Sequence, residues 1–187
     1  MRKTPQIYDL AIPEDDYKMA AVMERDKANF ESPNIWFYLG ADAINPSFAK
    51  VGITMGDLRS RSYSSANPNY YLFCAFQCDQ STTQLQLKSI ENSSLNYLDN
   101  VFCGDNNLTK RACHRESQRL SECYYNIDFQ EFFVCLHDYL LDQHGRYFQT
   151  AAYVNNHGFE EGYALSWQFN PSLAPHIKTH FLRLILR

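Results

Sequence analysis

Two short apolar runs joined by a turn-forming segment constrain the fold of this 187-residue chain more than any other feature. Residues 35–40 (IWFYLG) and 49–54 (AKVGIT) are rich in β-branched and aromatic residues, which favour strands. The segment between them contains Asn45, Pro46 and Ser47, which are typical of turns. The pattern predicts a β-hairpin.

The remaining elements are predicted from periodicity and from capping residues. Strands are expected at residues 70–78 and 163–169, and helices at about 14–30, 57–63, 81–100, 129–144 and 174–186. Gly145 suits the left-handed position that ends many helices. The chain is therefore expected to be an α+β protein with a short central sheet flanked by helices. Its predicted parts are an N-terminal helical extension (1–33), a core (34–100) and a mostly helical C-terminal extension packed on the core (101–187).

Composition and charge narrow the classes of protein to be considered. The chain is 45% hydrophobic and 20% charged, which argues against disorder and supplies enough apolar surface for one core. The net charge of −4 argues against a protein that coats nucleic acid non-specifically, but it permits a focused phosphate-binding site. The sequence contains neither a signal-peptide pattern nor a membrane-spanning run, so a cytoplasmic location is expected.

Six cysteines leave two alternatives open. In a reducing compartment they are expected to be free thiols. A structural zinc site is the other alternative, although no CxxC pair occurs. Its candidate ligands are Cys103, Cys113, Cys123, Cys135, His114 and His137.

Four motifs stand in a recognisable order within residues 34–100. They are 36–38 (WFY), 50–52 (KVG), 57–61 (DLRSR) and 89–95 (SIENSSL). In this order and spacing they resemble the GIY-YIG nuclease superfamily. The flanks on both sides fall outside the resemblance.

The first two motifs depart from the family pattern. Trp36 and Phe37 stand where the first motif has Gly and Ile, while its Tyr is kept as Tyr38. Lys50 replaces the Tyr of the second motif, whose Gly is kept as Gly52. Some branches of the superfamily, including restriction-type and phage-related members, also carry Lys at this position. The resemblance therefore allows an active enzyme of phage or mobile-element origin.

The resemblance implies a catalytic role for four residues. Tyr38 is expected to be the general base toward water, and Arg61 and Lys50 are expected to stabilise the phosphate. Glu91 is expected to bind Mg²⁺ or Mn²⁺ together with water and substrate oxygens. A free phenol has a pKa near 10, so Tyr38 needs a nearby cation, and Lys50 across the hairpin is the expected source.

Additional nucleic-acid contacts are expected from basic and aromatic residues outside these four. Residues 106–119 carry a net charge of +3 and read either as an arm on the DNA backbone or as a solvated helix. The expected nucleic-acid-binding residues are Arg59, Tyr63, Lys110, Arg111 and Arg115.

The implied activity is metal-dependent hydrolysis of DNA phosphodiester bonds. DNA is the expected partner, and a homo-oligomer or a protein partner is compatible with it, because one such site cuts one strand. The first alternative is a catalytically inactive GIY-YIG-like module that binds nucleic acid or protein. The second is an unrelated α+β regulator whose cysteines bind metal.

Overall fold

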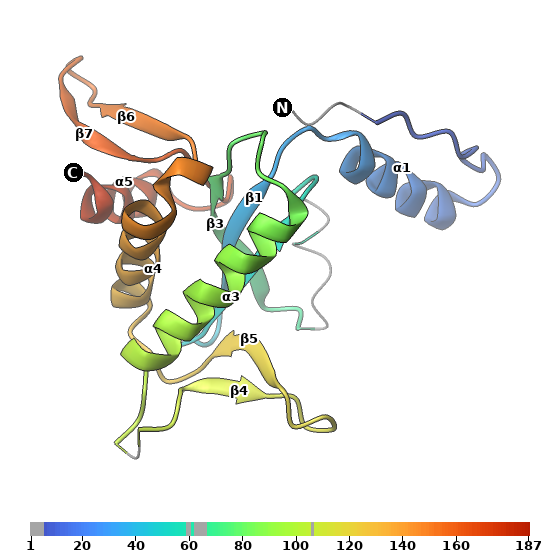
Figure 1. The fold of residues 1–187 in the computed structure, drawn as a ribbon. Coiled ribbons are helices and arrows are strands. Elements are labelled where there is room, and N and C mark those ends of the chain that lie inside the picture. Colours follow the sequence, from blue (N-terminus) through green and yellow to red (C-terminus); the bar gives the residue numbers. More distant parts are fainter. Residues whose placement is uncertain (1–5, 59–60, 62–66, 106) are drawn as a thin grey trace.

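The hairpin expected at residues 35–54 is present and lies at the centre of the main sheet (Figure 1). The computed structural model describes residues 6–58, 61, 67–105 and 107–187. Over these residues the chain is α+β, with one six-stranded antiparallel sheet, a separate two-stranded hairpin and flanking helices. In chain order the elements are α1 (Tyr17–Glu31), β1 (Trp36–Asp42), β2 (Ala49–Thr54), β3 (Tyr70–Gln77), α3 (Gln84–Val101), β4 (Arg111–Cys113), β5 (Leu120–Tyr124), α4 (Phe129–His144), η1 (Gly145–Tyr147), β6 (Thr150–Val154), β7 (Glu160–Leu165), β8 (Trp167–Phe169) and α5 (Pro175–Ile185).

The sheet has the strand order β4-β5-β2-β1-β3-β8. In the central hairpin Tyr38 pairs with Gly52, and Gly40 pairs with Lys50. On the other side of β1, the pairing with β3 shifts between Leu39 and Gly40, which marks a local irregularity. Because side chains alternate along a strand, this register decides which residues share each face of the sheet.

Helices α3 and α4 cover one face of the sheet (Figure 1). α3 begins with a capping box in which Thr83 and Gln86 satisfy each other's backbone N–H groups. Its buried face includes Leu87, Ile90 and Leu98, as the helical spacing predicts. Each fully buried leucine contributes about 1.5–3 kcal/mol through the hydrophobic effect. Apolar side chains therefore hold α3 on the sheet, although Glu91 and Ser94 are also buried on this helix.

Residues 101–187 differ from the expected mostly helical extension. They contain α4 and α5, but they also supply β4, β5 and β8 to the main sheet and the whole β6-β7 hairpin. The sheet therefore extends beyond the core expected at residues 34–100. Several of these strands are short and partly exposed, so they lack the long apolar alternation that reveals a strand in sequence.

Two local expectations are also corrected. The strand expected at residues 163–169 is divided into β7, in the small hairpin, and β8, in the main sheet. Gly145 is not a left-handed helix end, because its φ of −50° is helical and the chain continues into η1. Most of the short helix expected at residues 57–63 lies outside the described residues.

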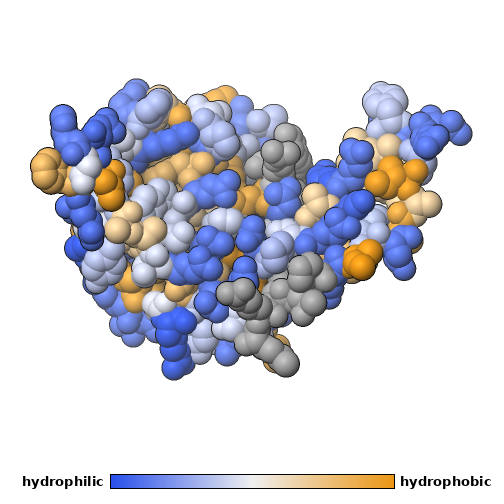
Figure 2. Space-filling view, turned by 90° about the horizontal axis from the view of Figure 1, so that it is seen from above, coloured by the Kyte–Doolittle hydropathy of each residue, from blue (hydrophilic) through white to orange (hydrophobic). Residues whose placement is uncertain are grey.

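The N-terminal helix α1 stands to one side of the rest of the molecule (Figures 1 and 2). Asp16 caps its first turn, and the helix ends just before Pro33, as the sequence predicts. Apolar side chains remain exposed on and around it, including Leu10, Tyr17 and Phe30. Over the described ranges, every helix falls short of the length and hydropathy needed to cross a bilayer.

Candidate active site

Tyr38 lies on the sheet face opposite α3 and α4. Along β1, Phe37 and Leu39 join the main core beneath the helices. Trp36 and Tyr38 point the other way and form a small separate cluster. The alternation of β1 thus separates the packing residues from the candidate base.

The ring of Tyr38 lies directly over Gly52, its partner on β2. A Cβ atom at Gly52 would lie 2.4 Å from the Tyr38 hydroxyl, so only glycine leaves room for this ring. Tyr38 is 5% exposed, and this burial raises the pKa of its phenol to about 12. The Arg61 guanidinium acts in the opposite direction and lowers that pKa. The phenol is therefore protonated at neutral pH in this state.

Arg61 is placed between the end of β2 and the start of α3. It lines a cleft of about 350 Å³ with residues from both elements. The other lining residues are Ile53, Thr54, Met55, Gln84 and Leu87. An arginine guanidinium is planar and donates hydrogen bonds to two phosphate oxygens at once, so this position suits an anion-binding group.

Glu91 is buried on α3, with a relative exposure of 2%. Burial raises the pKa of its carboxyl, and a hydrogen bond donated by the Lys88 ammonium opposes that rise. Lys88 is one helical turn earlier and its side chain is 56% exposed. The carboxylate is therefore held by a partner that reaches in from solvent.

Tyr38, Arg61 and Glu91 share one electrostatic neighbourhood. The charges of Arg61 and Glu91 both act on the Tyr38 phenol, and Arg61 also lowers the pKa of Glu91. Glu122 on β5 raises the pKa values of Tyr38 and Glu91 and so belongs to the same neighbourhood. Neither Glu122 nor Lys88 is predicted from the sequence. The i,i+3 spacing of Lys88 and Glu91 was a usable signal, whereas nothing near Glu122 points to the site.

Lys50 is placed differently from expectation. It was expected across the hairpin from Tyr38, but the register puts it opposite Gly40, two positions away. Its ammonium lies 5.6 Å from the ring centroid of Tyr70, the first residue of β3. Lys50 and Gly52 are two residues apart on β2, so they share one face of the sheet, and this is the face of Tyr38. The Lys50 ammonium nevertheless contacts Tyr70 and not Tyr38.

The residues present offer limited ligands for a divalent cation. Glu91 supplies one carboxylate, and the charge of Glu122 raises the pKa of that carboxyl. Among the described residues no group of three histidine, cysteine, aspartate or glutamate side chains is arranged to hold a metal. A single carboxylate completed by water and substrate oxygens is compatible with Mg²⁺, which keeps much of its hydration shell. Binding there requires Lys88 to leave the carboxylate.

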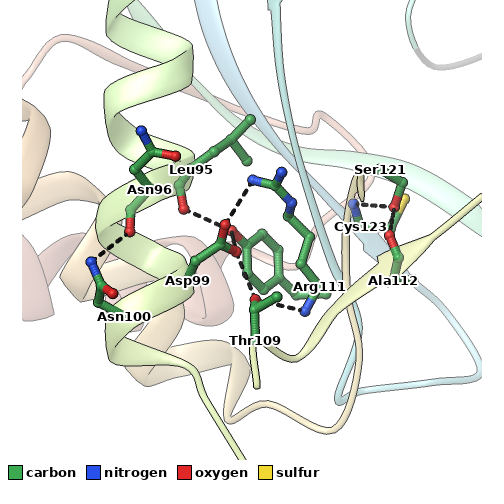
Figure 3. A network of polar contacts seen from close by, with 10 residues as sticks. Leu95, Asn96, Asp99, Asn100, Thr109, Arg111, Ala112, Ser121 and Cys123 are labelled. Atoms are coloured by element: carbon green, nitrogen blue, oxygen red, sulfur yellow. Dashed lines mark hydrogen bonds and ion pairs between the residues drawn. The ribbon is translucent and has the colours of Figure 1, made fainter. Parts of the chain in front are cut away.

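Among the expected nucleic-acid-binding residues, Arg111 makes an internal contact. Arg111 is turned into the protein, where its Nη1 atom lies 3.0 Å from Asp99 of α3 (Figure 3). Thr109 and Tyr124 donate hydrogen bonds to the same carboxylate. Arg111 therefore joins the β4-β5 hairpin to α3.

The structure describes two further members of that set, Lys110 and Arg115. Arg115 is exposed in the turn after β4, and Lys110 is half-buried just before β4. The region is a hairpin and not the helix considered from sequence. Arg59 and Tyr63 lie outside the described residues.

All six cysteines are free thiols. Comparisons of the chain with protein-family models, with curated proteins and with solved structures found no match.

Proposed function

We propose that this protein is a metal-dependent endonuclease that hydrolyses DNA phosphodiester bonds. Tyr38 is the general base, Arg61 and Lys50 stabilise the phosphate, and Glu91 binds Mg²⁺. The observation that supports the proposal best is the electrostatic coupling of Tyr38, Arg61 and Glu91, which come from a strand, the segment after β2 and a helix. DNA is the proposed partner. Cleavage of both strands requires a second active site, as in a dimer, or two successive nicking events by one site.

The proposed chemistry begins with removal of a proton from water. The Tyr38 phenolate accepts this proton, and the hydroxide oxygen forms a bond to phosphorus while the bond to the leaving oxygen breaks. The leaving oxygen keeps the electron pair of that bond and takes a proton from solvent water. Arg61 donates hydrogen bonds to the phosphate as its negative charge develops. When bound, Mg²⁺ supplies positive charge to the phosphate oxygens. Because the phenol has a pKa of about 12, only a small fraction of the free enzyme holds the base in its active form.

The test is conversion of supercoiled plasmid to nicked circles with Mg²⁺ and with EDTA. The wild type is expected to nick the plasmid in Mg²⁺ and to leave it intact in EDTA. The substitutions Tyr38→Phe and Glu91→Gln are each expected to lower the nicking rate by about 100-fold or more. Tyr163→Phe, an exposed tyrosine on β7, is the matched control and is expected to cut normally. If the wild type leaves plasmid, single strands and RNA intact over a range of metals and pH values, the proposal is wrong.

A catalytically inactive DNA-binding module is the second candidate. It is favoured by the ion pair of Glu91 with Lys88 and by the raised pKa of Tyr38, since neither group is poised for chemistry in this state. This candidate predicts that the wild type binds a labelled duplex in EDTA but cuts none of the substrates.

A further inference from the structure

Tyr70 occupies the space left by a second glycine on the Tyr38 face. A Cβ atom at Gly40 would lie 2.2 Å from the Tyr70 ring and 2.4 Å from its hydroxyl. The ring therefore lies across β1 at Gly40, just as the Tyr38 ring lies across β2 at Gly52. Gly40 is opposite Lys50, so the Tyr70 ring reaches toward that lysine.

The hydroxyl of Tyr70 is buried without a hydrogen bond to any described residue. Tyr70 as a whole is only 7% exposed. Native proteins satisfy nearly all buried hydroxyl groups, so an orphaned one needs an explanation such as a ligand. The buried hydroxyl of Tyr124 follows the rule, since it donates a hydrogen bond to Asp99 at 2.9 Å.

The nearby cation indicates which ligand fits. The Lys50 ammonium is 5.6 Å from the Tyr70 ring centroid and offers three N–H donors. A phenol O–H and an ammonium on the same side of a sheet both donate, so they suit an acceptor with negative charge and disfavour a metal cation. A phosphate oxygen has this chemistry.

The pair lies next to Tyr38. Gly40 and Gly52 are diagonal neighbours across the hairpin, where Cβ positions are separated by about 7 Å. Each tyrosine hydroxyl is 2.4 Å from one of these two positions, so both hydroxyls border the same small area of the sheet. Tyr38 and Arg61 also act electrostatically on Tyr70, which agrees with this placement.

We infer that Tyr70 is a substrate-binding residue whose hydroxyl, together with the Lys50 ammonium, holds a phosphate oxygen of the DNA beside Tyr38. The inference rests on the proposed function for the identity of the substrate. It adds a residue that no motif of the sequence singled out. It also explains why Lys50 faces Tyr70 and why that hydroxyl is left without a protein partner.

The decisive variant is Tyr70→Phe, because it removes only the orphaned hydroxyl. Its urea unfolding midpoint is expected to equal or exceed that of the wild type, since no internal hydrogen bond is lost. Its affinity for a fluorescently labelled DNA duplex in EDTA is expected to fall about tenfold, the effect of one charge-assisted hydrogen bond. Tyr71→Phe, the next residue on the other face of β3, is the matched control and is expected to bind DNA normally.

A double-mutant cycle tests the partnership with Lys50. Lys50→Met is expected to weaken DNA binding, and adding Tyr70→Phe in that background to cost less than tenfold, because the two groups hold the same oxygen. Equal effects of Tyr70→Phe with and without Lys50 overturn the partnership. A lowered unfolding midpoint for Tyr70→Phe also overturns the inference, because the hydroxyl then has a structural partner.

Failure of this inference and failure of the nuclease proposal are distinguishable. If Tyr70→Phe binds and cuts DNA like the wild type, the inference is wrong and the nuclease proposal stands. If the wild type binds duplex in EDTA through Tyr70 but never cuts, the phosphate-binding pair stands and the proposed chemistry is wrong. If the wild type binds no duplex, the inference is wrong.

Discussion

At the scale of single residues, glycines decide where the tyrosines of this site lie. A methyl group at Gly52 would lie 2.4 Å from the Tyr38 hydroxyl, so Gly52→Ala must displace the ring or the strand. We expect this variant to lose about 1–3 kcal/mol of unfolding free energy and to abolish nicking. Gly145→Ala is the control, because its new methyl meets nothing closer than 3.8 Å and its backbone is helical. Urea unfolding and plasmid nicking measure both effects, and normal nicking by Gly52→Ala contradicts a catalytic Tyr38.

The raised pKa of Tyr38 gives a second prediction at this scale. A general base is active when deprotonated, and burial holds the pKa of this phenol at about 12. Between about pH 6 and about pH 9, kcat/KM is therefore expected to rise about tenfold per pH unit without a plateau. The measurement is the nicking rate at limiting DNA over this range. A plateau near pH 7 would assign the base to another group.

At the scale of elements, the β4-β5 hairpin is attached to α3 by one polar network. Arg111 and Asp99 have side chains only 12% and 19% exposed, so removing one partner leaves a largely buried charge (Figure 3). Arg111→Met is expected to lower the free energy of unfolding by about 3 kcal/mol. Arg115→Met, in the exposed turn of the same hairpin, is expected to change it by less than about 0.5 kcal/mol. Equal, small effects in urea unfolding would contradict the structural role of Arg111.

Elements with a strong local pattern of apolar and capping residues were predictable from the sequence. Short strands that depend on pairing with a neighbouring strand were not. The central hairpin, α3 and α4 have apolar periodicities and capping residues that point to one structure. β4 and β8 have three residues each, and they are strands because a neighbouring strand pairs with them. From sequence, the basic segment around Lys110 reads as an arm on the DNA backbone or as a solvated helix, because its local sequence does not show that β4 pairs with β5.

At the scale of the whole molecule, one buried histidine is expected to couple folding to pH. His137 is fully buried, its Nδ1 lies 3.0 Å from Asp138, and its Nε2 accepts the N–H of Leu165. Burial lowers its pKa below the ordinary value of 6.5, although Asp138 opposes the shift. Below about pH 6.5, His137 binds a proton in the unfolded chain but stays neutral in the folded chain. The free energy of unfolding is therefore highest above that pH and falls as the pH drops toward the folded-state pKa of His137.

The measurement is the free energy of unfolding in urea at about pH 7.5 and about pH 5. The wild type is expected to lose stability over this interval. His137→Gln keeps an acceptor for the Leu165 N–H but cannot titrate, so its loss is expected to be smaller. An identical loss in both proteins would assign the pH dependence to other groups.

The candidate site shows the same division between local and tertiary information. The sequence singled out Tyr38, Arg61 and Glu91, and the structure brings these three into one electrostatic neighbourhood. It could not reveal Tyr70 or Glu122, because a tyrosine at the start of a strand and a glutamate on a short strand have no distinctive spacing. It also misplaced Lys50, because hairpin register depends on which residues pair and not on the motif alone.

The sequence by itself determined the α+β class, the central hairpin and the alternation that puts Tyr38 and Phe37 on opposite faces. These are local properties, because strand and helix periodicities are fixed by the geometry of a few consecutive residues. Only the tertiary structure decided that Arg111 is a structural ion-pair partner, that Lys50 faces Tyr70, and that Glu122 joins Glu91. Such placements depend on strand register and on helix packing across the sheet, which arise from contacts between residues far apart in the chain.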